Sequence, residues 1–216
     1  MRYPRRAALV LGLVATLTGC ATTSAQTGEG TPPPVNDVTP EPVSTSEPSR
    51  LVISSTDMQI VLEDGTVAET IAYFDPMVPA VEKITELFGS PPRVDATDGP
   101  DATDYEWPGF RLDSDGPAIE PLRPEIFVTV SVAEINDIQL ETTDEHQVGD
   151  DLRPLADAHP EDSSVYPLES GEELSVKILS VPVETGDADR AFRTGLSADP
   201  ADGVIRQIHA PEKNFE

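Results

Sequence analysis

The amino-acid sequence predicts an α+β domain, in which an antiparallel β-sheet carries one or two short helices packed on one face. Segments that alternate apolar and polar residues, separated by turn dipeptides, outnumber segments with helical spacing. One stretch, 75–92, has helical spacing together with the residues that end a helix. Cys20 is the only cysteine, so disulfides within the chain are excluded and a hydrophobic core has to stabilise the fold.

The first predicted elements are strands. Residues 50–74 contain short apolar runs on both sides of Asp64-Gly65, a dipeptide typical of hairpin turns because glycine adopts a positive φ without cost. After this turn Val67, Glu69 and Ile71 alternate with smaller residues, as in a strand with two different faces.

A single helix follows in the stretch "DPMVPAVEKITELFGSPP". Asp75 or a nearby residue is expected to cap it, with Pro76 or Pro79 in its first turn. Val81, Ile84 and Phe88 fall on one face at helical spacing, and Gly89 is expected to end the helix.

The middle of the chain predicts more strands. The stretch "YEWPGFRL", 105–112, is expected to form one bent strand, in which a bulge at Pro108-Gly109 brings its apolar side chains to one face. Residues 125–143 predict a second hairpin with its turn at Asn136-Asp137.

The C-terminal part predicts a second, weaker helix at 148–159, a central strand at 173–183 and a last strand at 202–211. A turn followed by an alternating strand recurs in "EDGTVAETI", "INDIQLETT" and "ADGVIRQIH", and helical segments follow the first two. The domain is therefore expected to contain two loosely related hairpin-helix units.

The N-terminus has the pattern of a secretory signal. Three arginines precede the apolar run Ala7–Leu17, which is shorter than the roughly 20 residues that span a bilayer. The run ends in Leu17, Thr18, Gly19 and Cys20. This sequence resembles the lipobox of bacterial lipoproteins, a resemblance that implies cleavage before Cys20, a diacylglycerol on its thiol, and stable anchoring through two acyl chains. The alternative is a secreted protein without a lipid anchor, in which Cys20 would be a free thiol with no role.

Three segments follow from this pattern: a signal peptide at 1–19, a lipidated Cys20 with a tether at 20–49, and a single globular domain at 50–216. The tether is rich in Pro, Thr, Ser, Gly and Glu, which bury too little apolar surface to fold. The alternative is that these residues pack on the domain. The prediction places the protein on the extracytoplasmic face of the cell membrane.

The net charge of −26 limits the choice of partners. Removal of the three signal arginines would take it to −29. Nucleic acid is excluded because phosphates require Lys and Arg, and docking on anionic lipid headgroups is disfavoured. Solubility explains such a charge, and attraction of a cation or a basic partner is the alternative.

Further segments carry a second resemblance. The helix ending "LFGSPP", the strand "YEWPGF", the segment "QVGDDLRPLAD" and the closing "GVIRQIHAP", together with the lipobox and tether, resemble a group of uncharacterised actinobacterial lipoproteins. Part of this pattern is similar to the beta-lactamase inhibitor protein and to BamE/SmpA-like lipoproteins. The likeness implies a binding role, with a protein of the cell envelope as partner, and carries over no functional residue beyond Cys20.

Catalytic and metal-binding motifs are absent from the sequence. It has no H-E-x-x-H, no cysteine-histidine cluster, no G-x-S-x-G and no nucleotide-binding glycine pattern. The Asp-rich segment 95–104 lacks the glycine that an EF-hand loop requires, so a solvated loop is favoured over a calcium site. We therefore predict no catalytic residue, no metal site and no cofactor.

Tyr105, Trp107 and Phe110 are the candidate partner contacts. Aromatic side chains serve as anchors in protein interfaces when they are exposed. The alternative is that Trp107 packs in the core against the helix face. The sequence therefore predicts a lipid-anchored, non-enzymatic binding domain, with an extracytoplasmic hydrolase of unrecognised type as the alternative and a solute receptor as a third option.

Overall fold

Thirteen strands in two sheets, together with two helices and one 3-10 turn, make up the described part of the chain. The computed structural model describes residues 46–90, 92–96, 103–121, 123–168, 171–182 and 191–213. The α+β fold class is confirmed, with two sheets in place of the expected one. None of the helices in these ranges is long and apolar enough to cross a membrane.

The smaller sheet has the strand order β3-β2-β1-β9-β8. Its strands are β1 (Pro48–Ile53), β2 (Asp57–Leu62), β3 (Val67–Ala72), β8 (Glu134–Ile135) and β9 (Ile138–Thr142). All neighbours are antiparallel except β1 and β9, which run parallel because the chain returns to this sheet through a long connection.

The larger sheet is antiparallel throughout and has the order β10-β11-β12-β13-β7-β6-β5-β4. Its first four strands along the chain are β4 (Arg93–Ala96), β5 (Thr103–Trp107), β6 (Phe110–Ser114) and β7 (Phe127–Val130). The other four are β10 (Ser163–Leu168), β11 (Gly171–Pro182), β12 (Ala191–Ala198) and β13 (Ile205–Lys213).

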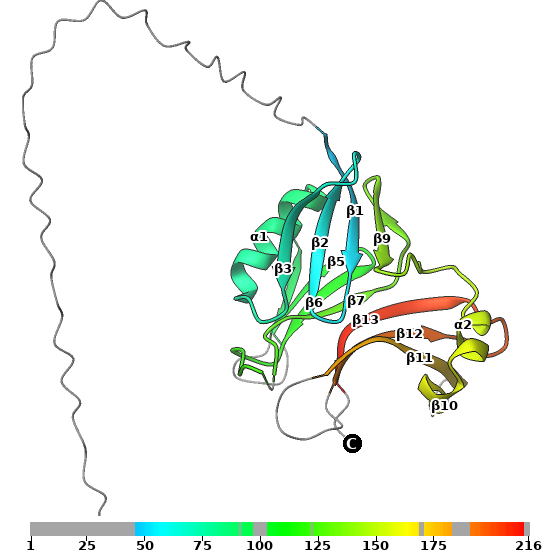
Figure 1. Ribbon diagram of the computed structural model, residues 1–216. Coiled ribbons are helices and arrows are strands. Elements are labelled where there is room, and N and C mark those ends of the chain that lie inside the picture. The colour runs from blue at the N-terminus through cyan, green and yellow to red at the C-terminus, as the bar shows by residue number, and fades with distance from the viewer. Residues whose placement is uncertain are drawn as a thin grey trace, which may run out of the picture. The chain divides into compact units, whose positions relative to one another are not determined.

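The order of elements repeats (Figure 1). A hairpin (β2-β3), the helix α1 (Met77–Phe88) and four strands (β4 to β7) form the first unit. The second unit is the hairpin β8-β9, the helix α2 (Arg153–Ala158) with the turn η1 (Pro160–Asp162), and the strands β10 to β13. The last strands of the two units, β7 and β13, pair and join the two groups of four into one sheet. This agrees with the two hairpin-helix units expected from the sequence.

Helix α1 holds the first unit together. Its buried face is Met77, Ala80, Ile84 and Phe88, which confirms the expected Ile84 and Phe88, whereas Val81 packs only partly buried at the edge of this face. Asp75 does not cap it; the first free amide, that of Met77, donates instead to the Glu125 carboxylate at 2.9 Å. At the other end Gly89 takes a left-handed φ of 67°, as expected.

Both sheets and α1 contribute to one hydrophobic core. Phe88 makes edge-to-face contacts with Trp107 of β5 and Phe110 of β6, with ring centroids 6.0 and 5.2 Å apart. On its other side α1 is tied to β3 by an ion pair between Lys83 and Glu69. The helix therefore links the smaller sheet to the larger one.

Two sequence interpretations need correction. "YEWPGFRL" is not one bulged strand but a tight hairpin in which Trp107 pairs with Phe110. Gly109 there has a φ of 84°, which the turn requires. Residues 125–143 do not form one hairpin, because β7 joins the larger sheet while β8 and β9 pair in the smaller one. The chain changes sheets between them, so their shared alternation could not reveal the split.

The domain starts slightly earlier than expected. The described residues belong to a unit that spans 44–216, and β1 begins at Pro48 rather than at residue 50. The signal peptide at 1–19, Cys20 and nearly all of the tether lie outside the described residues, as does the centre of the Asp-rich segment, 97–102.

Candidate functional site: the polar face of the larger sheet

Alternation along the strands gives the larger sheet one apolar and one polar face. In the β5-β6 hairpin, Trp107 and Phe110 point to the core, while the neighbouring pair, Glu106 and Arg111, points the other way. The side chains of Arg93, Arg111 and Glu106 are 69%, 43% and 42% exposed. We call the face that carries them the polar face.

One row of cross-strand neighbours runs over the polar face through seven strands. The pairing of β4, β5, β6, β7, β13, β12 and β11 places these residues in a continuous line: Arg93, Glu106, Arg111, Thr129, His209, Gly195 and Lys177. We call it the central row. Because residues directly opposite each other in adjacent strands are within contact distance, side chains far apart in the sequence meet here.

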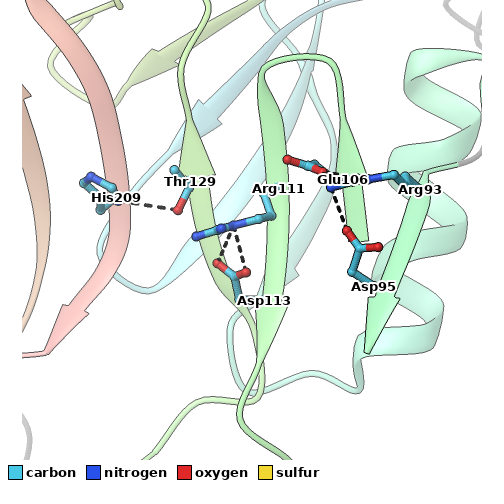
Figure 2. A network of polar contacts seen from close by, with 7 residues as sticks. All are labelled: Arg93, Asp95, Glu106, Arg111, Asp113, Thr129 and His209. Atoms are coloured by element: carbon cyan, nitrogen blue, oxygen red, sulfur yellow. Dashed lines mark hydrogen bonds and ion pairs between the residues drawn. The ribbon is translucent and has the colours of Figure 1, made fainter. Parts of the chain in front are cut away.

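Ion pairs hold the N-terminal end of the central row (Figure 2). The Arg93 guanidinium donates to Glu106, and its Nη2 lies 2.6 Å from the Asp95 carboxylate. Arg111 Nε lies 2.8 Å from the carboxylate of Asp113. At the other end Lys177 Nζ is 3.3 Å from Glu212. These contacts restrict side chains that would otherwise be free to rotate.

Three carboxylates stand side by side next to the central row. Asp95, Asp104 and Asp113 are direct partners on β4, β5 and β6, and we call them the acid row. Burial raises the pKa of Asp113 to about 6, although the Arg111 guanidinium acts against this rise; the neighbouring Asp104 raises the pKa further. Like charges directly opposite each other destabilise a sheet, so the acid row costs the fold free energy.

A shallow hollow of about 190 Å³ lies over the middle of the central row. Its polar lining consists of Glu106, Arg111, Thr129, Ser131, Gln207 and His209. At about 30 Å³ for each water molecule, the hollow has room for roughly six waters or for one partner side chain.

His209 is the half-buried histidine of the hollow. Its Nδ1 lies 3.4 Å from the Thr129 hydroxyl, across the joint between the two units (Figure 2). Burial lowers the pKa of His209; Glu212 and Glu173 act in the opposite direction, and Arg111 lowers it further. The imidazole is therefore neutral near pH 7 and offers one hydrogen-bond donor and one acceptor.

The predicted aromatic contacts lie elsewhere. Trp107 and Phe110 are 2% and 1% exposed, and Tyr105 packs partly buried against the core. The Trp107 indole donates to the Ser90 carbonyl at 2.8 Å. The core alternative thus describes Trp107 and Phe110: the tight turn between them directs both rings inward, so a partner cannot reach them without opening the core.

Among the residues of the polar face, the sequence singled out Asp95 and Asp104, which bound the Asp-rich segment, and not the others. Alternation could have found Arg111 and Asp113, since they lie between the apolar residues Phe110, Leu112 and the buried Ser114. The position of His209 beside Thr129 could not be found, because no local pattern shows that β13 pairs with β7, 80 residues away.

A second polar cluster lies on η1. His159, Glu161 and Asp162 place one ligand atom each within 4.8 Å of one another, so the structure assembles a set of metal-ligand types that the sequence analysis did not predict. His159 and Glu161 are exposed, and Arg193 lies 3.3 Å from Asp162. The arginine competes with any cation for that carboxylate.

Comparison of the chain with protein-family models, with curated proteins and with solved structures found no match in any of the three. The polar face offers charged and hydrogen-bonding groups in fixed positions over a wide, shallow surface, an arrangement suited to binding.

Proposed function

We propose that the protein is a lipid-anchored binding domain on the extracytoplasmic face of the cell membrane, which presents its polar face to a protein partner. The N-terminal pattern that ends in Cys20 supports this localisation. The observation that carries the binding role is the central row, which lines up charged and polar side chains of both units on an exposed sheet face.

The size of the central row supports a protein as the partner. Six intervals between strands, at about 4.8 Å each, give a row about 29 Å long. A standard interface buries about 800 Å² on each side, which corresponds to a patch roughly 28 Å across. A small molecule would occupy the hollow alone and leave most of this row unused.

The ion pairs support binding through preorganisation. Ordering a long side chain at an interface costs about 0.5–1.5 kcal/mol. Arg93 and Arg111 are already held by carboxylates of the same face, so less of this cost remains to be met when a partner docks. Arginine is also enriched in protein interfaces.

A cross-linking experiment tests the proposal. A photoreactive amino acid is placed at Ser131, an exposed position of the polar face, and at Val78, which is 61% exposed on α1. The full chain is expressed in membranes of its host. We expect a protein adduct of one defined mass from Ser131, none from Val78, and its loss when Arg111→Glu is added. Equal adducts from both positions, or none, would contradict the binding role of this face.

One contact favours the alternative of an extracytoplasmic hydrolase, namely the approach of His209 to Thr129 in the hollow. Nucleophilic catalysis also requires a group that orients the base. Among the described side-chain hydrogen bonds of His209, that to Thr129 is the only one. Turnover of ester or peptide substrates that disappears in Thr129→Val would favour the hydrolase over the binding domain.

A further inference from the structure

The charges of the polar face indicate what its partner carries. Six carboxylates lie on it: Asp95, Asp104, Glu106, Asp113, Glu173 and Glu212. Three cationic side chains oppose them, those of Arg93, Arg111 and Lys177. A fourth, Arg193 opposite Glu212, is paired with Asp162 of η1, and this pair adds no net charge. With His209 neutral, the face carries three more negative than positive charges.

We propose that the partner docks a basic protein surface on the polar face, with a Lys or Arg side chain over the acid row. This inference rests on the proposed binding function and adds the chemistry of the partner. Complementary charge steers association and selects among partners, and it disfavours acidic surfaces by like-charge repulsion.

The acid row supplies the first argument. The described ion pairs give Asp95 and Asp113 an arginine each, whereas no described arginine or lysine bonds Asp104, which lies between them. Repulsion among these three neighbouring carboxylates lowers the free energy of unfolding. A cation placed over Asp104 by a partner would remove that repulsion, so the face is more favourable in the complex than alone.

The second argument comes from the other end of the face. Glu212 binds Lys177 through Oε1, while its buried Oε2 has no hydrogen-bond partner among the described residues. This carboxylate lies over Gly195, where a Cβ would collide with it. The Glu212 side chain as a whole is 30% exposed, so its carboxylate adds negative charge to this end of the face, although Oε2 itself is closed to a partner.

The lining of the hollow between these two ends includes two small polar side chains. Thr129 and Ser131 leave room above the sheet, and Glu106 provides a carboxylate at the rim. A long basic side chain can lie along such a surface and place its charged head at the carboxylates. A bulky apolar side chain would instead cover Glu106 and Arg111 without hydrogen bonds, at the cost of their desolvation.

A titration with a defined probe tests the inference. The full chain, solubilised in neutral detergent, is titrated at low ionic strength with the peptide Gly-Arg-Gly-Lys-Gly-Arg-Gly, blocked at both ends, and with its counterpart in which Glu replaces Arg and Lys. The double variant Asp104→Asn/Glu106→Gln is compared with Glu82→Gln/Glu86→Gln, which removes the same charge from exposed positions of α1.

We expect the basic peptide alone to bind, with an affinity at least tenfold lower for the double variant of the polar face and changed less than twofold for the α1 control. An equal loss in both double variants would show attraction by net charge only and would overturn the inference. So would the absence of binding to the unmodified chain. If cross-links from Ser131 persist in membranes while the peptide fails to bind, the binding function stands and only the basic partner is refuted.

Discussion

Replacement of Phe88 by alanine is the sharpest test of how the two sheets are joined. The side chain is 1% exposed at the C-terminal end of α1 and touches the rings of Trp107 and Phe110. Phe→Ala in a core costs about 3–5 kcal/mol, and each edge-to-face aromatic pair adds about 0.5–1.5 kcal/mol beyond burial. Because two such pairs are lost at once, we expect a cost at the upper end, about 4–5 kcal/mol.

Urea titration followed by tryptophan fluorescence measures this cost, since Trp107 is the only tryptophan and lies against the mutated site. With a slope of about 2 kcal/mol per molar urea, the midpoint should fall by about 2 M. Val78→Ala, on the exposed face of the same helix, is the matched control and should change the free energy of unfolding by less than about 0.5 kcal/mol. If both variants unfold at the same urea concentration, α1 does not belong to the shared core and the arrangement described above is refuted.

Three further predictions concern the polar face, the central hairpin and the anchor. Because the pKa of Asp113 is raised to about 6, its ionisation destabilises the folded state as the pH rises through that value. Asp113→Asn should therefore stabilise the protein by about 1 kcal/mol at pH 7.5, after allowance for solvent screening, and should have no effect below about pH 4. Thermal melting measures this, with the exposed Asp144→Asn as control, and a gain in stability that persists at pH 4 would contradict the prediction. Gly109→Ala should lower the free energy of unfolding by about 2–4 kcal/mol, because a positive φ is strained for alanine and the new Cβ would overlap a valine side chain. Gly65→Ala has the same φ of 84° but its Cβ meets no atom, so it should cost only about 1–2 kcal/mol. Similar melting temperatures for the two variants would show that backbone strain alone acts. Cys20→Ala should release the protein from the membrane fraction or leave the signal uncleaved, and a mature, membrane-bound variant on immunoblots would refute the lipid anchor.

The local elements were predictable because their signals lie within a few residues. Asp64-Gly65 and Asn136-Asp137 both form the expected turns, and the second has a positive φ at both residues, as the favoured two-residue hairpin turn requires. Helix α1 ends at Gly89 for a reason that is equally local. The helix face was predicted correctly at Ile84 and Phe88, whereas Val81 is only partly buried, because the surface against which a helix packs decides how deeply each apolar residue is buried.

The candidate site was predictable only in part. The lipobox residue Cys20 follows from a linear motif and stays a prediction, since it lies outside the described residues. The aromatic cluster around Trp107 was recognised as a group, but its orientation depended on the turn at Pro108-Gly109, and a bulge and a tight turn both bring the rings to one face. Their packing against Phe88 of α1 decides that the rings are buried.

Composition and short motifs thus predict the localisation, the acidic character, the α+β class and the repeat of hairpin and helix, because each of these depends on composition or on residues close together in the sequence. The polar face depends on strand pairing across the whole domain. Thr129 meets His209 only because the last strands of the two units pair, and Asp95, Asp104 and Asp113 stand abreast only because three strands align in one register. Register is selected by burial of the opposite, apolar face in a shared core. The side chains of the polar face are therefore brought together by packing on the other side of the sheet, which no local stretch of the chain specifies.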